Sequence, residues 1–102
     1  MLIVLTTVNS FAEAESLANG IVNGKLAGCV QILPNITSIY EWEGSVQKES
    51  EHLLLIKTVS ENWISLKSYI TQNHSYSVPE IVSIEPRSVA EPYEKWLQDV
   101  LK

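Results

Sequence analysis

Three side chains in this sequence could bind a transition metal through sulfur or imidazole nitrogen: Cys29, His52 and His74. Thiolate suits soft ions such as Cu(I) or Zn²⁺, and imidazole suits copper. No two of them have the spacing of a ligand pair such as C-x-x-C or H-x-x-x-H. Any metal site must therefore be assembled by the fold or by symmetry between chains.

Each of these donors also has a structural interpretation. Cys29 could be a packed, unreactive thiol, which behaves as a small hydrophobic group. His52 stands beside Glu51 in a predicted strand, where a cross-strand surface contact is the simpler role. His74 belongs to a loop near Tyr76 and Glu80, and both interpretations stay open for it.

Enzymatic motifs are absent from the sequence. It contains no G-x-S-x-G turn, no glycine-rich phosphate loop and no G-x-G-x-x-G. Carboxylates such as Glu41 and Glu43 alternate along predicted strands, as solvated faces do. Lys57 ends an apolar strand, and it is either a snorkelling end charge or the cation of a pocket. We therefore predict a protein that is not an enzyme and has no organic cofactor.

Length and charge restrict the class of protein further. The 102 residues make one domain, residues 1–102, and 45% of them are hydrophobic, as in a globular protein. The formal net charge of −5 repels nucleic acids and anionic membranes. The single cysteine cannot form an intrachain disulfide, which favours a cytoplasmic location. We expect neither a signal peptide nor a membrane span, since no run approaches roughly 18 apolar residues.

The chemistry-bearing residues must be positioned by six elements and a final helix. Residues 2–8 form an apolar strand without alternation, which is typical of a central strand. Ser10 and Glu13 form a capping box that begins a helix, and Gly24 is its left-handed terminator. The even positions from Val30 to Trp42 predict one half-buried face of a long strand over residues 29–42.

The second half of the chain repeats the pattern. A strand over residues 46–58 ends in an apolar, central stretch, and Ser60 or Thr58 caps the following helix. A short strand over residues 80–85 leads to a last helix with Tyr93 and Trp96 on its apolar face.

This order predicts an α+β protein with a ferredoxin-like βαββαβ fold, an antiparallel sheet, an extended hairpin and a C-terminal helix. Its central strands are the first and the third, which are the two runs without alternation. Pro34 cannot donate to a strand ladder, so the second strand lies at an edge or carries a bulge.

The length of the hairpin predicts an oligomer. Residues 29–42 span about 46 Å as a strand, whereas a chain of this size has a diameter of roughly 33 Å. The hairpin should overhang its own domain and leave Tyr40 and Trp42 for a partner subunit to bury. In the alternative, bulges at Pro34 break the strand into two pieces that curl back over one core.

Four segments resemble the CutA family of divalent-cation tolerance proteins: LAGCV at 26–30, SIYEWEG at 38–44, SEHLLLIKT at 50–58 and HSYSVPEI at 74–81. The resemblance implies a ferredoxin-like fold, a homotrimer whose hairpins pair with neighbouring subunits, and an architecture similar to PII signalling proteins. It also implies a link to copper and other divalent metals, with no established enzymatic activity.

The family resemblance marks nine positions of interest, some of which could line clefts between subunits: Cys29, Tyr40, Trp42, Glu51, Lys57, His74, Tyr76, Pro79 and Glu80. The sequence departs from the family pattern at four places. Gly28 replaces a usual Ala, Glu41 an aromatic residue, Ser45 a common Lys, and Ser75 the Pro of His-Pro-Tyr. The last change removes a rigid residue from the loop that carries His74.

Three functional hypotheses follow. In the first, a homotrimer binds Cu(II) or a similar divalent ion weakly, through His74 with carboxylates such as Glu80, or through Cys29 repeated by threefold symmetry. In the second, a PII-like sensor binds a small ligand in the intersubunit cleft and signals to an unknown protein partner. Its cleft residues are Tyr40, Trp42, Glu51, Lys57, Tyr76 and Glu80. In the third, the trimer is a scaffold without a ligand.

Overall fold

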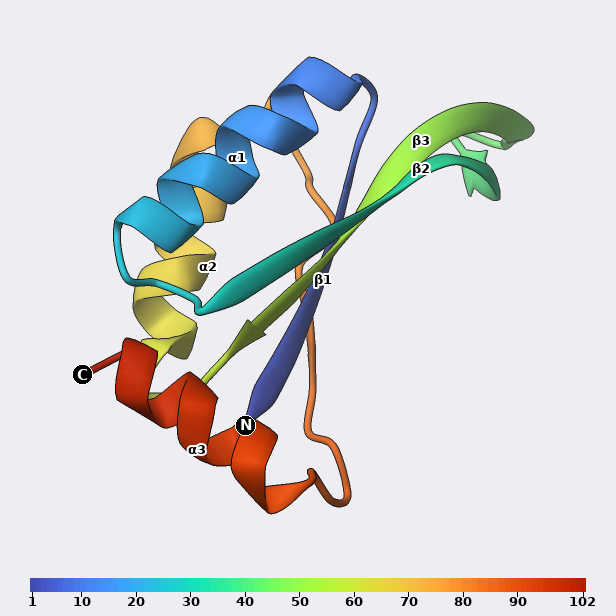
Figure 1. The fold of residues 1–102 in the computed structure, drawn as a ribbon. Helices are drawn as coiled ribbons and strands as arrows, with labels where there is room; N and C mark the ends of the chain where they lie inside the picture. The colour runs from blue at the N-terminus through green and yellow to red at the C-terminus, as the bar shows by residue number, and fades with distance from the viewer.

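A computed structural model describes residues 1–102 as a four-stranded sheet with helices on one face (Figure 1). The strands are β1 (Leu2–Val8), β2 (Cys29–Trp42), β3 (Ser45–Thr58) and β4 (Val82–Ile84). The helices are α1 (Phe11–Asn23), α2 (Trp63–Asn73) and α3 (Glu91–Val100), with a 3₁₀ turn, η1 (Ser60–Asn62), before α2. The order of elements confirms the predicted α+β fold, although β4 is three residues long and begins later than expected.

The sheet has the strand order β2-β3-β1-β4, and every neighbouring pair is antiparallel. The two runs without alternation, β1 and β3, are central, and the proline-containing β2 is an edge strand, as predicted. In Figure 1, α1 and α2 cover one face of the sheet, while α3 lies at the end near the N-terminus.

The core lies between the sheet and the two covering helices. It combines alternate residues of β1 and β3 with the apolar stripes of α1 and α2: Leu2, Val4, Val8, Leu54, Ile56, Ala14, Leu17, Ile21, Leu66 and Ile70. Burying one such Leu, Ile or Val side chain stabilises a fold by about 1.5–3 kcal/mol. Of the apolar face predicted for α3, only Leu97 is fully buried, whereas Tyr93 and Trp96 remain exposed.

The ends of α1 correct two sequence predictions. The Ser10 hydroxyl accepts from the Glu13 N–H at 3.1 Å, which is one half of the predicted capping box. The other half is absent, because the Glu13 carboxylate binds Ser75 instead. Gly24 has φ −83°, and Lys25 adopts the left-handed conformation with φ 60°. The left-handed residue that ends this helix is therefore not the glycine.

The start of α2 also differs from the prediction. Ser60 begins η1, and no side-chain hydrogen bond caps α2. The Thr58 hydroxyl donates to the Leu26 carbonyl at 2.7 Å, so it ties the loop after α1 to the end of β3. Neither of the two predicted residues caps this helix.

A β-bulge divides β2. Two residues, Pro34 and Asn35, stand opposite the single residue His52. Asn35 has a positive φ of 58°, and its N–H donates to His52 Nδ1 at 3.3 Å. His52 also packs edge-on against Phe11 of α1, with ring centroids 5.8 Å apart. This histidine therefore has a structural role at the bulge, as the cross-strand interpretation proposed.

The bulge reverses the side-chain alternation of β2, which corrects the prediction of one continuous face. Before it, Val30 and Ile32 pack against the core under the helices. After it, Ile36 lies opposite Glu51 and Tyr40 opposite Gln47, so the even residues join the sheet face without helices. The extra residue thus directs Tyr40 and Trp42 away from their own core.

The β2–β3 hairpin extends beyond the rest of the domain, as its length predicted (Figure 1). The molecule measures 45 × 26 × 22 Å, and pairing continues to Trp42 opposite Ser45. Tyr40 is 39% and Trp42 53% exposed. The alternative, in which β2 breaks at Pro34 and curls back over one core, is wrong.

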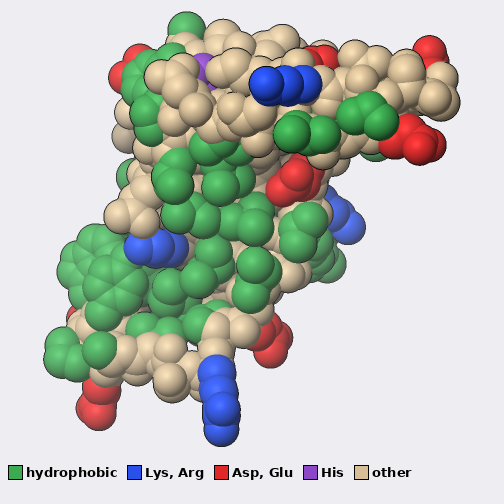
Figure 2. All heavy atoms as spheres, turned by 90° about the vertical axis from the view of Figure 1, so that its right-hand side faces the viewer, with side chains coloured by type: hydrophobic (Ala, Val, Ile, Leu, Met, Phe, Trp, Pro, Cys, Tyr) green, Lys and Arg blue, Asp and Glu red, His purple; other side chains and the backbone are tan.

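The sheet face without helices is largely apolar, and Figure 2 looks onto it. Strand register places seven apolar residues on it: Ile3, Leu5, Leu33, Leu53, Leu55, Val82 and Ile84. Leu33, Val82 and Ile84 are each more than 40% exposed. We call this set the open sheet face. No helix of the protein has the length and hydropathy to cross a membrane.

Candidate functional site

A groove of about 790 Å³ lies where the hairpin leaves the open sheet face. It is lined by residues of β1, β2, β3 and the segment before β4: Thr7, Ser38, Ile39, Tyr40, Trp42, Gln47, Glu49, Glu51, Tyr76, Ser77, Val78 and Glu80. Five of the residues predicted from the sequence are among them, namely Tyr40, Trp42, Glu51, Tyr76 and Glu80. A smaller hollow of about 340 Å³ beside α3 contains none of the predicted residues.

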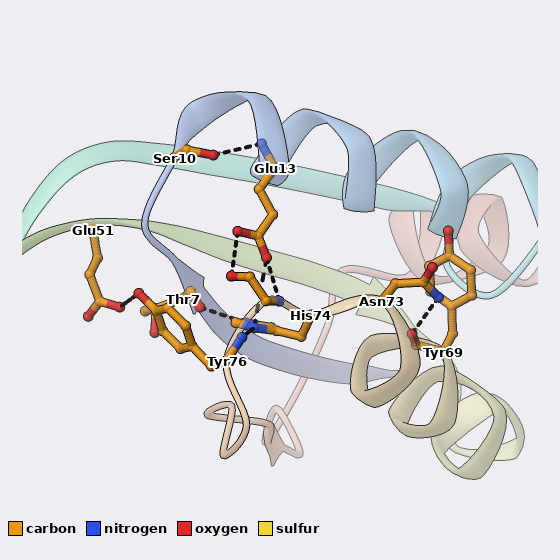
Figure 3. A network of polar contacts seen from close by, with 9 residues as sticks. Thr7, Ser10, Glu13, Glu51, Tyr69, Asn73, His74 and Tyr76 are labelled. Atoms are coloured by element: carbon orange, nitrogen blue, oxygen red, sulfur yellow. Dashed lines mark hydrogen bonds and ion pairs between the residues drawn. The ribbon is translucent and has the colours of Figure 1, made fainter.

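Tyr76 and Glu51, which both line the groove, form a hydrogen-bonded pair (Figure 3). The Tyr76 hydroxyl donates to Glu51 Oε2 at 2.8 Å, and Glu51 is only 7% exposed. Burial raises the pKa of Tyr76, and the hydrogen bond to the negatively charged Glu51 raises it further. The phenol therefore stays protonated at neutral pH and remains a donor.

A second tyrosine–glutamate pair lies further along the hairpin. The Tyr40 hydroxyl donates to Glu49 Oε1 at 2.8 Å, and this bond raises the pKa of Tyr40. The sequence analysis did not select Glu49 as a site residue. Its position two residues before Glu51 in a strand was the available signal, because such residues share one face.

His74 supports the groove from behind instead of opening into it. Its Nε2 lies 2.8 Å from the Thr7 carbonyl, which can only accept, so this nitrogen carries the proton. Its Nδ1 accepts from the Tyr76 N–H at 3.0 Å, and the side chain is fully buried. Both ring nitrogens are therefore engaged (Figure 3), and the ring contacts Tyr76 at 4.8 Å between centroids.

Ser75 secures the same loop to α1. Its N–H and hydroxyl donate to the two carboxylate oxygens of Glu13 at 3.0 and 2.8 Å. Glu13 Oε2 also lies 3.8 Å from His74 Nδ1. A proline at position 75 could donate neither bond. Hydrogen bonds to Glu13 thus hold the loop that the family pattern stiffens with a proline.

Cys29 and Lys57 lie at the other end of the sheet. They are opposite each other in the β2–β3 ladder, level with Ile3, whereas His74 contacts Thr7. Lys57 Nζ is 5.5 Å from the centre of the Tyr93 ring. Ile3, level with Cys29 and Lys57, and Thr7, which contacts His74, are four residues apart in β1, a distance of about 13 Å.

The predicted metal donors are therefore not brought together within one chain. Glu80 lines the groove, Cys29 is half-buried at the start of β2, and the side chain of His74 is buried beside Tyr76. No group of three or more His, Cys, Asp or Glu side chains is placed to hold an ion. Pro79, half-buried, precedes Glu80.

The sequence and the fold both match known proteins. The profile of the CutA1 divalent ion tolerance protein family matches residues 2–100. The divalent-cation tolerance protein CutA of Thermus thermophilus is 40% identical over 97 residues, which cover 95% of this chain and 94% of that protein. The chloroplastic protein CutA of Arabidopsis thaliana is 42% identical over 98 residues.

That match covers 96% of this chain, which spans just over half (54%) of the Arabidopsis protein. The structure of the periplasmic divalent cation tolerance protein CutA from Archaeoglobus fulgidus superimposes with a TM-score of 0.95 at 30% identity over the full length of both chains. A structure from Thermus thermophilus gives 0.91 at 41% identity, covering 95% of each chain. The family resemblance of the four sequence segments is confirmed: this chain belongs to the CutA1 divalent ion tolerance protein family.

Proposed function

We propose that this protein acts in divalent-cation tolerance as a non-enzymatic homotrimer that binds Cu(II) or a similar ion weakly where its chains meet. Relatives along the whole chain, such as that of Thermus thermophilus, are named divalent-cation tolerance proteins. Each chain has a formal charge of −5, so an assembly of three would attract cations.

The observation that carries the trimer is the open sheet face together with the hairpin beside it. A monomer would leave Leu33, Val82, Ile84 and Trp42 in water, each more than 40% exposed. Contiguous apolar surfaces of this kind commonly mark protein interfaces. A second and a third copy, each bringing the same face and hairpin, would bury them.

No group of three donors is placed to hold an ion within one chain, so the proposed ion site lies between chains. Cys29 is the best placed of the predicted donors, because its strand partner Lys57 lies on the open sheet face and symmetry would repeat its thiol. Glu80 in the groove is a second candidate. His74 would first have to give up its bond to Thr7 or Tyr76.

Calorimetry with Cu(II) tests the metal proposal on the wild type, Cys29→Ser, Glu80→Gln and His74→Gln. We expect saturable binding that weakens in Cys29→Ser or Glu80→Gln, with His74→Gln close to wild type once its folding is confirmed. Absence of saturable binding in the wild type would contradict the proposal. Equal binding in all variants would remove these residues from the site.

The second candidate function is a PII-like sensor, and it is favoured by the groove, which collects five of the residues predicted for a ligand cleft. Lys57 is outside the groove of its own chain, and no Lys or Arg lines it, which opposes a polyphosphate ligand. A thermal-shift screen separates the two functions, since bound ligands stabilise the folded state. Stabilisation by metal ions alone would favour the metal function, and stabilisation by nucleotides or metabolites would favour the sensor.

We also propose a cytoplasmic location, and for the sensor a protein partner.

A further inference from the structure

Lys57 is the only positively charged strand residue on the open sheet face. Strand register places it opposite Ile3 and Cys29, at the end of the face next to α3. Its ammonium group lies 5.5 Å from the centre of the Tyr93 ring and forms no salt bridge within the chain. An interface that covered this face would take Lys57 out of water, and a charge that loses water needs an opposite charge beside it. The proposed trimer must therefore supply an acidic group to Lys57.

The acidic side chains of the same face lie at its other end. Alternate residues of β3 share one face, so Glu49 and Glu51 lie on the same side of the sheet as Lys57. Apolar side chains cover the middle of the face between them (Figure 2). Glu49 and Lys57 are eight residues apart in the strand, a distance of about 27 Å, which two side chains cannot bridge. Lys57 therefore has to find its carboxylate on another chain.

Glu49 is the more accessible of the two carboxylates. It is exposed, and the Tyr40 hydroxyl donates to its Oε1 at 2.8 Å, which holds the carboxylate on the hairpin. Glu51, in contrast, is 7% exposed and accepts from Tyr76. A carboxylate accepts through both oxygens. Glu49 can therefore accept from a lysine of another chain and keep its bond to Tyr40.

Exposed aromatic side chains accompany the charge at each end. Tyr93 and Trp96 of α3 are 36% and 42% exposed, and their rings stack with centroids 5.5 Å apart. Tyr40 and Trp42 of the hairpin are exposed to a similar extent. Aromatic residues are enriched in protein interfaces. The two ends are thus alike in aromatic character and opposite in charge.

We propose that the three chains associate head to tail, so that Glu49 on the hairpin of one chain pairs with Lys57 of the neighbouring chain. The hairpin aromatic residues, Tyr40 and Trp42, would then lie near Tyr93 and Trp96 of that neighbour. A contact between unlike surfaces closes into a ring when each chain is rotated by the same angle. Contacts between like ends would bring Lys57 next to Lys57, which is unfavourable. This pairing rests on the proposed trimer and specifies which surfaces meet in it.

A charge swap tests the pairing, with assembly measured by light scattering over a dilution series, in urea if the wild type stays assembled on dilution. Lys57→Glu and Glu49→Lys each place like charges at the contact. We expect each to raise the concentration needed for half-assembly at least about tenfold. The two substitutions together restore opposite charges at every contact, so the combined variant should recover most of the loss.

Lys48→Glu combined with Glu49→Lys is the matched control. It keeps the same net charge as the charge swap and also removes the carboxylate that accepts from Tyr40. Lys48, however, lies on the other face of β3, so we expect no recovery. Circular dichroism checks the fold of each variant. If Lys57→Glu fails to fold, a double-mutant cycle of Lys57→Gln and Glu49→Gln replaces it, and we expect the two effects to be coupled.

The proposal is overturned if the charge swap assembles no better than the single variants, or if the control recovers as well. It is also overturned if Lys57→Gln assembles more tightly than the wild type, as contacts between like ends would require. In these cases a wild-type mass of three chains would leave the proposed trimer standing. A wild-type mass of one chain would remove both the trimer and the pairing.

Discussion

Ser75 donates two hydrogen bonds to Glu13, one from its backbone N–H and one from its hydroxyl, across 62 residues of sequence. The pair joins the first turn of α1 to the loop that carries His74 and Tyr76 (Figure 3). Tyr76 in turn donates to Glu51 in the groove. The position of a groove residue thus depends on a helix on the other face of the sheet.

Glu13→Ala removes the acceptor of both Ser75 bonds. We expect it to lower the free energy of unfolding by about 1–3 kcal/mol, the usual value for hydrogen bonds to a charged, partly buried group. Urea denaturation measures the change, and Glu15→Ala, exposed on the same helix, is the control. Equal effects of the two variants would contradict a structural role for the Glu13–Ser75 contact.

His52→Ala tests the bulge. It removes the acceptor of the Asn35 N–H and the edge-on contact with Phe11, so we expect a loss of about 1–2 kcal/mol. Hydrogen exchange should accelerate at Asn35 and along the outer part of the hairpin. His52→Asn, which offers a side-chain acceptor of similar reach, should restore part of the protection. Unchanged exchange at Asn35 in His52→Ala would show that the bulge does not depend on this side chain.

Gly28→Ala probes the contact of α3 with the start of β2. A Cβ at this position would lie 2.6 Å from Leu97 Cδ1, inside a buried contact, so we expect about 1–3 kcal/mol of destabilisation. The family usually has Ala here, so the packing of Leu97 should differ in those relatives. In a double-mutant cycle with Leu97→Ala, the effect of Gly28→Ala should shrink. If Gly28→Ala destabilised the Leu97→Ala variant as much as the wild type, the destabilisation would not come from contact with Leu97.

Because of Tyr76, the free energy of unfolding should fall as the pH rises into the alkaline range. Its folded pKa is raised above the ordinary value of 10.0, so the folded state holds the phenolic proton more tightly than the unfolded chain does. This contribution is complete below pH 10 and is lost as the pH rises towards the folded pKa. Urea denaturation between pH 9 and about 11 should show a steeper loss for the wild type than for Tyr76→Phe. Parallel curves would contradict the raised pKa.

The sequence predicted the strand order and the bounds of β2 because apolar runs, a proline and strand length are local signals. It did not predict the reversal of alternation after Pro34. That reversal depends on Asn35 adopting a positive φ and on His52 accepting its N–H from another strand. One extra residue moved Tyr40 and Trp42 to the opposite face from Val30, which no periodicity within β2 could indicate.

Only part of the candidate site was predicted, because some of its contacts join residues that are far apart in the sequence. Tyr40, Trp42, Glu51, Tyr76 and Glu80 were found through the family resemblance, and they do line one groove. The role of His74 was left open, because its two partners include the Thr7 carbonyl, 67 residues away. The predicted second hydrogen bond of the capping box is absent because Glu13 accepts instead from Ser75, which is distant in sequence.

The most direct test of the central claim, an assembly of three chains, is the molar mass in solution by light scattering coupled to gel filtration. We predict a mass of three chains of 11.4 kDa each. Charged substitutions on the open sheet face, such as Leu55→Glu, should lower it, whereas Glu15→Gln should not. A wild-type mass of one chain, at micromolar concentration and with the protein folded, would contradict the account.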